Sequence, residues 1–134
     1  MRELQSFVFL LLFAYSPYAI SSKCFALTEV YFDARASGLS LVQKAKIDDA
    51  IGIIRNRGRR VDVVVVIGHT DNSEVKGTNR KKLSIARAES VRQYLLRTNP
   101  DLKEHVEVDG KGSLQPIHHL DHLNRRVEME IACY

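Results

Sequence analysis

The sequence predicts one α/β domain with a two-layer mixed sheet, built in the order β-α-β-α-β-β. Two observations favour this fold class. Short runs of β-branched and aromatic residues, typical of strands, alternate with two longer segments whose apolar residues recur at helical spacing. A helix also connects the first strand to the second and another connects the second to the third, which makes these three strands parallel. With 134 residues, 45% of them hydrophobic, the chain can bury a single core.

The first strand and the first helix are predicted from the segments TEVYF (28–32) and 40–58. TEVYF is β-branched and aromatic, as strands are. Ser40 and Gln43 form a capping box at the start of the helix, and Gly58 ends it. A stripe of apolar residues should face the sheet, and it consists of Ile47, Ala50, Ile51 and Ile54.

The second half of the domain begins with the strand VDVVVVIG (61–68), which is apolar on both faces. This pattern is typical of an inner strand that is covered on each side. Asn79 is placed to cap a second helix that ends before Asn99, where a proline follows. VEVDGKG (106–112) predicts a third strand, and VEMEIA (127–132) alternates as a half-exposed fourth strand does. The buried stripe of the second helix is expected to contain Ser84, Ala88, Val91 and Leu95.

Residues 1–21 are expected to be a secretory signal peptide rather than part of the fold. A short apolar run, FVFLLLFAY (7–15), follows one basic residue and precedes small residues. Ala19 and Ser21 suit the positions that a signal peptidase reads, so we predict cleavage before Ser22 and a mature domain of residues 22–134 in the periplasm. The alternative is an uncleaved anchor, although a spanning helix needs about 20 apolar residues.

The charge and the cysteines narrow the class of protein. Net charge is +4, and the basic residues are scattered rather than gathered on one face with aromatic residues, which argues against nucleic-acid binding. Cys24 and Cys133 have no CxxC spacing, which argues against redox chemistry or a zinc knuckle. An exported protein can keep a disulfide. Lys23 stands where a lipoprotein signal needs a small residue, so lipid anchoring is not expected.

Polar residues directly follow the buried second strand, as Gly68-His69-Thr70-Asp71. Ligands of open α/β sheets bind beyond the carboxyl ends of parallel strands. Polar groups at this place leave the core undisturbed, and they face the same region as the N-termini of the helices. The segment is therefore a candidate binding site.

Three ordered segments resemble the family of OmpA-like peptidoglycan-binding domains. They are GHTDN (68–72), NRKKLSIARAESVRQYL (79–95), and GKG (110–112) followed by Pro116 and NRRVE (124–128). YFD (31–33) and the helix with IDDAI (47–51) match the front half, so that the resemblance covers residues 26 to 132. The family includes the C-terminal part of outer-membrane protein A, the peptidoglycan-associated lipoprotein and the wall-binding part of flagellar stator proteins.

The resemblance implies non-covalent binding of the peptide stem of Gram-negative peptidoglycan, centred on diaminopimelate, with no cofactor and no catalysis. Asp71 corresponds to the residue that receives the ligand's ammonium group, and Arg87 to the residue that receives its carboxylate. A carboxylate offers only acceptors, and a guanidinium offers a planar fork of donors, so this pair suits a zwitterion. Arg87 is expected at the edge of the seam between helix and sheet. Further ligand-binding residues implied are Asn79, Asp33, Phe32, Thr70, Leu83 and Arg125.

The family also places the last strand antiparallel to the others, which brings the start of the first strand and the end of the last to one edge of the sheet. Since disulfides require Cα atoms within about 7 Å, we predict a Cys24–Cys133 disulfide. Envelope or outer-membrane proteins are further partners that the family implies, together with association with the outer membrane or a membrane complex.

Two other functions are left open by the residues. IHHLDH (117–122) gathers side chains that can ligate zinc, which would suit a zinc-dependent wall hydrolase, yet the spacing is not HExxH. A solvated loop is the simpler interpretation. The other alternative is an interaction subunit of an envelope machine that keeps the fold without the binding site. Taken alone, Asp71 could be a turn former, and Arg87 could lie on a solvated helix face.

Overall fold

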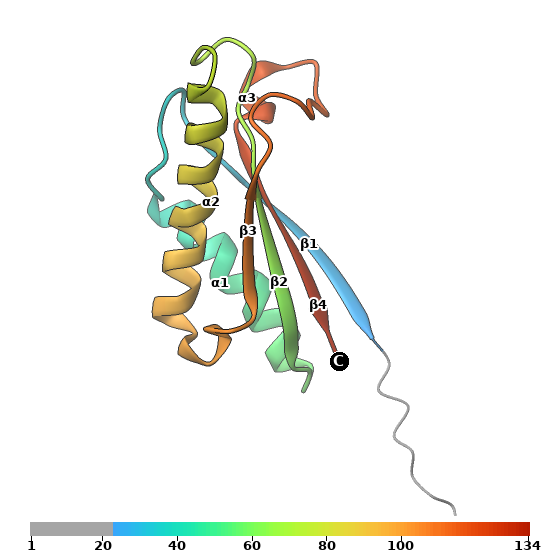
Figure 1. Cartoon of the computed structure of the whole chain (residues 1–134). Helices are drawn as coiled ribbons and strands as arrows, with labels where there is room; N and C mark the ends of the chain where they lie inside the picture. Colours follow the sequence, from blue (N-terminus) through green and yellow to red (C-terminus); the bar gives the residue numbers. More distant parts are fainter. Residues whose placement is uncertain (1–22) are drawn as a thin grey trace, which may run out of the picture.

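The computed structural model describes residues 23–134, so the predicted signal peptide and its cleavage site lie outside the described residues. Two long helices lie on one face of a twisted sheet (Figure 1). The elements in chain order are β1 (Cys24–Tyr31), α1 (Leu41–Asn56), β2 (Val61–Gly68), α2 (Asn79–Thr98), the 3₁₀ helix η1 (Pro100–Leu102), β3 (Val106–Gly110), α3 (Asp121–Asn124) and β4 (Arg126–Cys133).

The sheet has the strand order β1-β4-β2-β3. β4 is antiparallel to both of its neighbours, while β2 and β3 are parallel. The first three strands therefore run in one direction, as the sequence predicts, and β4 lies between β1 and β2. The carboxyl ends of β1, β2 and β3 and the start of β4 consequently meet at one edge, at the top of Figure 1.

The two helices begin differently from one another. Ser40 and Gln43 form the predicted capping box, in which the Gln43 N–H donates to Ser40 Oγ and the Ser40 N–H donates to Gln43 Oε1. At α2 the cap position is held by Thr78, with no side-chain cap hydrogen bond, and Asn79 is the first helical residue. The prediction that Asn79 caps α2 is therefore wrong. Asn79 contributes through its backbone instead, since its N–H donates to the carbonyl of Lys76 in the turn that precedes the helix.

The core lies between the helices and one face of the sheet. The apolar stripes predicted for α1 and α2 are buried as expected. The prediction that β2 is covered on each side is wrong for the described residues. Val63, Val65 and Ile67 face away from the helices and are only half-buried. They are flanked instead by their neighbours on β4, where Glu130 lies opposite Val65, and β-branched residues suit such a half-covered strand.

Two glycines let α2 lie directly on the ends of β2 and β3. A Cβ atom on Gly68 would lie 1.8 Å from the carbonyl oxygen of Ser84, and one on Gly110 would lie 2.6 Å from Ser84 Oγ. No other residue allows so close an approach of backbone to backbone. This contact brings the next turn of α2, which carries Arg87, against the end of β2.

The opposite edge of the sheet is closed by the predicted disulfide. Cys24 and Cys133 are directly paired residues of β1 and β4, with Cα atoms 4.9 Å apart, and their sulfurs are bonded. The prediction of this bridge is confirmed.

Within residues 23–134, no helix is both long and apolar enough to cross a membrane.

Candidate functional site

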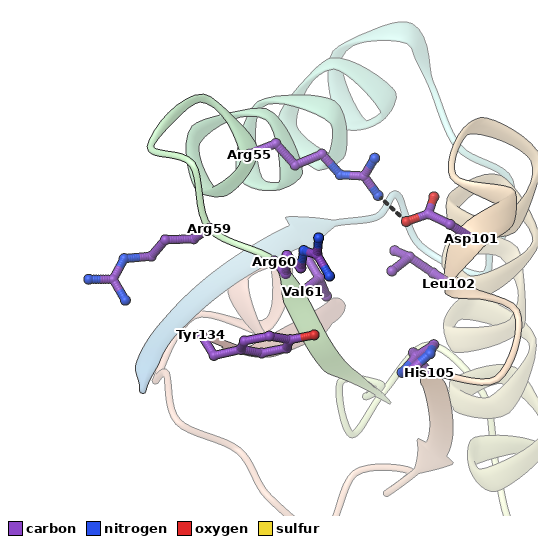
Figure 2. A pocket seen from close by; sticks show the side chains of 8 residues that line it. All are labelled: Arg55, Arg59, Arg60, Val61, Asp101, Leu102, His105 and Tyr134. Carbon is purple, nitrogen blue, oxygen red and sulfur yellow. Dashed lines mark hydrogen bonds and ion pairs between the residues drawn. The ribbon is translucent and has the colours of Figure 1, made fainter. Parts of the chain in front are cut away.

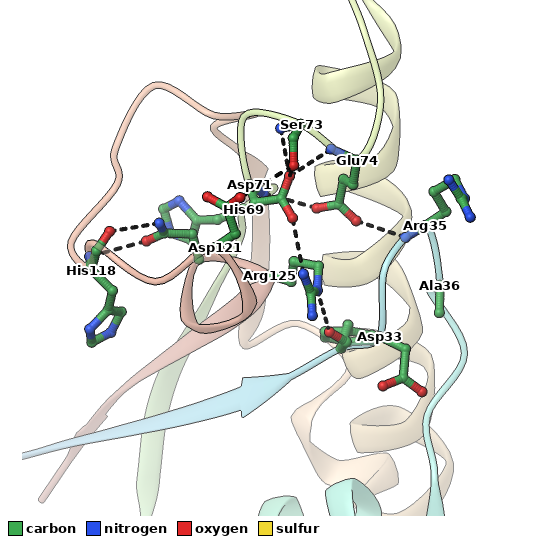
Figure 3. A network of polar contacts seen from close by, with 12 residues as sticks. Asp33, Arg35, Ala36, His69, Asp71, Ser73, Glu74, His118, Asp121 and Arg125 are labelled. Atoms are coloured by element: carbon green, nitrogen blue, oxygen red, sulfur yellow. Dashed lines mark hydrogen bonds and ion pairs between the residues drawn. The ribbon is translucent and has the colours of Figure 1, made fainter.

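The candidate site is a buried polar network at the edge where β1 and β2 end and β4 begins (Figure 3). The structure brings together residues that the sequence places far apart. Phe32 and Asp33 follow β1, Thr70 and Asp71 follow β2, Arg87 comes from α2 and Arg125 precedes β4.

Asp71 is almost completely buried, and both of its carboxylate oxygens accept hydrogen bonds. Its Oδ1 accepts from the N–H groups of Ser73 and Glu74, at 2.7 and 2.6 Å, and from Ser73 Oγ. Its Oδ2 accepts from Arg125 Nη1 at 3.1 Å. Burial raises the pKa of the Asp71 carboxyl, but the hydrogen bonds from Ser73, Glu74 and Arg125 outweigh this, so the pKa lies below its ordinary value. The carboxyl group is therefore ionised at neutral pH.

Arg87 is more deeply buried than the sequence indicates, with a side chain that has no exposed surface. Its Nη1 and Nη2 donate to the two carboxylate oxygens of Glu74, at 2.8 and 2.5 Å. Nε donates to the carbonyl of Ala36 at 2.8 Å, while Nη1 and Nη2 also donate to the carbonyls of His69 and Asp33. These five contacts match the five N–H donors of a guanidinium group.

Glu74 is the central residue that the sequence does not reveal. Its carboxylate has no exposed surface and accepts four N–H groups. Two come from Arg87, and the others are the backbone N–H groups of Asp71, at 2.9 Å, and Arg35, at 2.8 Å. Arg35 has a φ of 61°, which is uncommon for a residue other than glycine. Because Glu74 lies in an irregular connection, no periodicity could have indicated the direction of its side chain.

Phe32, Arg125 and Thr70 complete the wall of the network. The Phe32 ring lies 5.3 Å from the Arg87 guanidinium carbon, in a cation–π arrangement. Arg125 Nε donates to the Phe32 carbonyl, and the Arg125 side chain is 19% exposed. The Thr70 hydroxyl oxygen is buried and has no hydrogen-bond partner among residues 23–134. The Thr70 hydroxyl group is thus free to bond to a ligand, and Arg125 reaches the surface while it holds Asp71 and Phe32.

The remaining predicted site residues lie on the outer part of this edge. Asn79 is exposed at the start of α2, and Leu83 is half-buried one turn further along. The Asp33 side chain is also exposed, and it is the backbone carbonyl of Asp33 that contacts Arg87.

His69 belongs to a second network, formed with Arg126 and Glu128. Arg126 donates from Nε and Nη2 to Glu128 Oε1, and the same oxygen lies 3.5 Å from His69 Nε2. Burial lowers the pKa of His69 to about 4, and the neighbouring charge of Arg126 adds to this effect. The imidazole is therefore neutral at neutral pH, and it supports the strand end as a buried polar group.

The histidine-containing segment IHHLDH ends in the short helix α3 and is held by Asn124. The Asn124 side chain accepts from the N–H groups of Ile117 and His118 and donates to the carbonyl of His118. Figure 3 shows this loop beside the candidate site, with Asp121 near Ser73. In the described part of the chain, no three His, Cys, Asp or Glu side chains gather in a way that could hold a metal ion.

A separate pocket of about 340 Å³ lies at the other end of the sheet, where β2 begins (Figure 2). Arg55 and Asp101 form an ion pair across it at 2.8 Å, with side chains 42% and 63% exposed. Exposed pairs of this kind contribute little to binding or stability. The residues lining it are Arg55, Arg59, Arg60, Val61, Asp101, Leu102, His105 and Tyr134. The buried network at the opposite end is the stronger candidate.

Comparison with known proteins gives one family and one fold. The model of the OmpA family matches residues 31–129. Similar solved structures include the OmpA-like domain of FopA1 from Francisella tularensis, at 20% identity, with a TM-score of 0.68 and coverage of 82% of this chain and 73% of that one. A comparison with curated proteins finds no match.

Two further structures show the same fold. The peptidoglycan-associated lipoprotein from Burkholderia pseudomallei is 20% identical, with a TM-score of 0.63 and coverage of 77% of this chain and 88% of that one. The cell wall anchor of the T6SS from Pseudomonas aeruginosa is 22% identical, with a TM-score of 0.63 and coverage of 80% of each chain. The α/β fold that the strand and helix patterns predict is thus confirmed, and so is the resemblance to the OmpA-like domains.

Proposed function

Because this chain belongs to the OmpA family, we propose that it binds peptidoglycan non-covalently and so anchors a component of the cell envelope to the wall. Two proteins of similar structure are named for this association, one as a peptidoglycan-associated lipoprotein and one as a cell wall anchor. The proposal assigns no catalytic role to the chain and no cofactor.

The ligand group that fits the site is the diaminopimelate of the peptide stem. Its free end carries an ammonium group and a carboxylate, so that it needs a negative and a positive partner side by side. The observation that carries the proposal is the meeting of Asp71 and Arg87, both buried, at the end of β2. Oδ2 of Asp71 accepts one hydrogen bond from protein, which leaves acceptor capacity for an ammonium group.

Burial gives this pair its value for recognition. Charges on an exposed surface are screened by water and salt, whereas charges enclosed by protein and ligand are screened far less. A ligand that lacks one of the two charges leaves the opposite partner buried and unpaired, which typically costs on the order of 2–5 kcal/mol. The site therefore favours diaminopimelate over a stem residue such as lysine, whose side chain ends in an ammonium group alone.

We also propose that the chain is exported from the cytoplasm. We expect residues 1–21 to be removed as a signal peptide, which leaves the domain of residues 22–134 in the periplasm, with envelope or outer-membrane proteins as further partners. The Cys24–Cys133 bridge supports this placement, since disulfides persist in oxidising compartments such as the periplasm.

Co-sedimentation with purified sacculi tests the function. We expect the domain to pellet with diaminopimelate-type sacculi, to pellet less with sacculi whose stems carry lysine, and to release no soluble muropeptides. Absence from both pellets would overturn the proposal. Muropeptides in the supernatant would instead support the wall hydrolase that the histidine-rich loop suggests.

A further inference from the structure

We infer that the Glu74 carboxylate occupies the carboxylate-binding half of this site as an internal substitute for the ligand, and that it must leave before the ligand binds. The inference rests on the proposed function, and it adds a residue that controls access to the site. The groups that surround the Glu74 carboxylate are the N–H donors of Arg87 and the backbone N–H groups of Asp71 and Arg35, which together are called the cradle.

The cradle is built to hold a carboxylate. Its four N–H groups come from three separate segments, namely the connection after β1, the turn after β2 and the middle of α2. Arg35 contributes its N–H group from a backbone conformation with a φ of 61°. Such a conformation is strained for a residue other than glycine and persists where the surrounding structure requires it. Two side-chain donors in a planar fork and two backbone donors together match the acceptors of one carboxylate.

An incoming carboxylate cannot share this cradle with Glu74. Each N–H group of Arg87 already points at an acceptor of the protein, so that the ligand would find no free donor. A second carboxylate beside Glu74 would also suffer like-charge repulsion in a buried setting, where such repulsion is strong. The ligand carboxylate therefore binds only in place of the Glu74 carboxylate.

Glu74 is the member of the pair that can move. Arg87 lies in the middle of α2 and is tied to the carbonyls of Ala36, His69 and Asp33. Glu74 lies in the connection between β2 and α2, which has no regular structure. Rotation of its side chain releases the carboxylate while its backbone N–H group stays bonded to Asp71. The four donors of the cradle are then left facing the ligand.

This arrangement makes the affinity of the wild-type site lower than that of the open cradle. When only a fraction of molecules has an empty cradle, the apparent dissociation constant rises by the inverse of that fraction. It also sharpens selectivity, because only a ligand that brings its own carboxylate can replace the one that leaves. Lysine brings none at the end of its side chain.

Calorimetric titration tests the inference on three proteins, with free meso-diaminopimelate and with lysine whose α-amino and α-carboxyl groups are blocked, so that only its side-chain ammonium group is charged. They are the wild-type domain, the variant Glu74→Gln, which keeps the side-chain size, and the control Glu104→Gln, which makes the same change at an exposed residue before β3. We expect Glu74→Gln to bind diaminopimelate at least about tenfold more tightly than wild type, and Glu104→Gln to bind like wild type. Equal or weaker binding by Glu74→Gln, while wild type binds, would overturn the inference alone. If neither protein binds diaminopimelate or sacculi, the proposed function fails and the inference fails with it.

A measurement on the wild-type domain covers the case in which Glu74→Gln does not fold. In two-dimensional ¹H–¹⁵N NMR, added diaminopimelate should shift the Arg87 Nε–H and Arg35 amide signals, together with amides of the connection that carries Glu74. Shifts confined to the groups around Arg125 and Asp71 Oδ2, with the cradle signals unchanged, would show that Glu74 stays in place and would contradict the inference.

Discussion

Arg87 and Glu74 form a two-point ion pair in which neither side chain has any exposed surface. A buried pair of this kind contributes little net stability compared with apolar residues of similar size, but removal of one partner leaves the other charge buried without compensation. The pair therefore couples the integrity of the fold to the candidate site. Because of this pairing, a substitution of Arg87 changes the stability of the fold, and its effect on binding can be measured only on protein that remains folded.

Replacement of Arg87 by leucine should destabilise the domain by about 3–5 kcal/mol, because the Glu74 carboxylate then stays buried without its partner. The double variant Arg87→Leu, Glu74→Leu should recover part of this loss. Urea unfolding of the wild type, both single variants and the double variant measures the coupling. A loss below about 1 kcal/mol in Arg87→Leu would contradict the buried pairing.

Replacement of Gly68 by alanine should destabilise the domain by about 3 kcal/mol, because the new Cβ atom would meet the carbonyl oxygen of Ser84 at 1.8 Å. That oxygen belongs to the backbone of α2 and cannot rotate away. Gly52 in α1 is the matched control, since a Cβ atom there meets nothing within 4 Å. Gly52→Ala should stabilise by about 0.5–1 kcal/mol. Equal thermal stability of both variants would argue against the close packing of α2 on β2.

As the pH falls, His69 should lower the free energy of unfolding before the carboxyl groups become protonated. Its pKa is about 4 in the folded protein and about 6.5 in the unfolded chain. The unfolded state therefore binds a proton first as the pH falls, so that the contribution of His69 to stability is complete above about pH 6.5 and is lost as the pH falls toward about 4.

Between pH 7.5 and 5 this effect amounts to about 2 kcal/mol. Urea unfolding at the two pH values, compared between wild type and His69→Gln, measures it as a difference in slope. His119→Gln is the control, because His119 is exposed. A slope that persists unchanged in His69→Gln would assign the effect to other groups.

Reduction of the Cys24–Cys133 disulfide should lower the free energy of unfolding by up to about 4–5 kcal/mol, since the two cysteines lie 109 positions apart and the bridge closes nearly the whole domain. Unfolding in urea with and without reductant measures the loss. Intact-mass analysis after alkylation, on protein isolated from the periplasm, shows separately whether the disulfide is present before reduction. Two alkylated thiols in the oxidised sample would exclude the bridge.

Local sequence signals are sufficient for most of the fold. The apolar stripes of α1 and α2 follow from helical spacing, and the capping box at Ser40 consists of neighbouring residues whose types are visible in the sequence. The closeness of Asp71 and Arg87 also follows, because Asp71 comes three residues after the end of β2 and Arg87 adjoins the buried stripe of α2. The predicted cap of α2, Asn79, lies one residue after the observed cap, Thr78, since caps depend on backbone angles that the residue type does not fix.

Two features of the site depend on tertiary contacts that no local pattern encodes. Glu74 points inward because four donors converge on it, and three of these come from Arg35 and Arg87, far from it in the chain. The open face of β2 is half-covered by cross-strand neighbours, although its composition is that of a strand buried on both faces. In each case the surroundings, rather than the residue itself, decide the outcome.

The binding role proposed for Asp71 is measured by the effect of Asp71→Asn on binding to diaminopimelate-type sacculi. This variant keeps the size of the side chain and removes the charge that is proposed to receive the ligand's ammonium group. Asp62→Asn is the matched control, because it makes the same change at an exposed residue near the other end of β2. We predict that Asp71→Asn remains folded by circular dichroism and loses at least about tenfold in affinity, as expected when a buried charge loses its partner, while Asp62→Asn binds like wild type. Binding of folded Asp71→Asn with the affinity of the wild type would show that Asp71 does not receive the ammonium group.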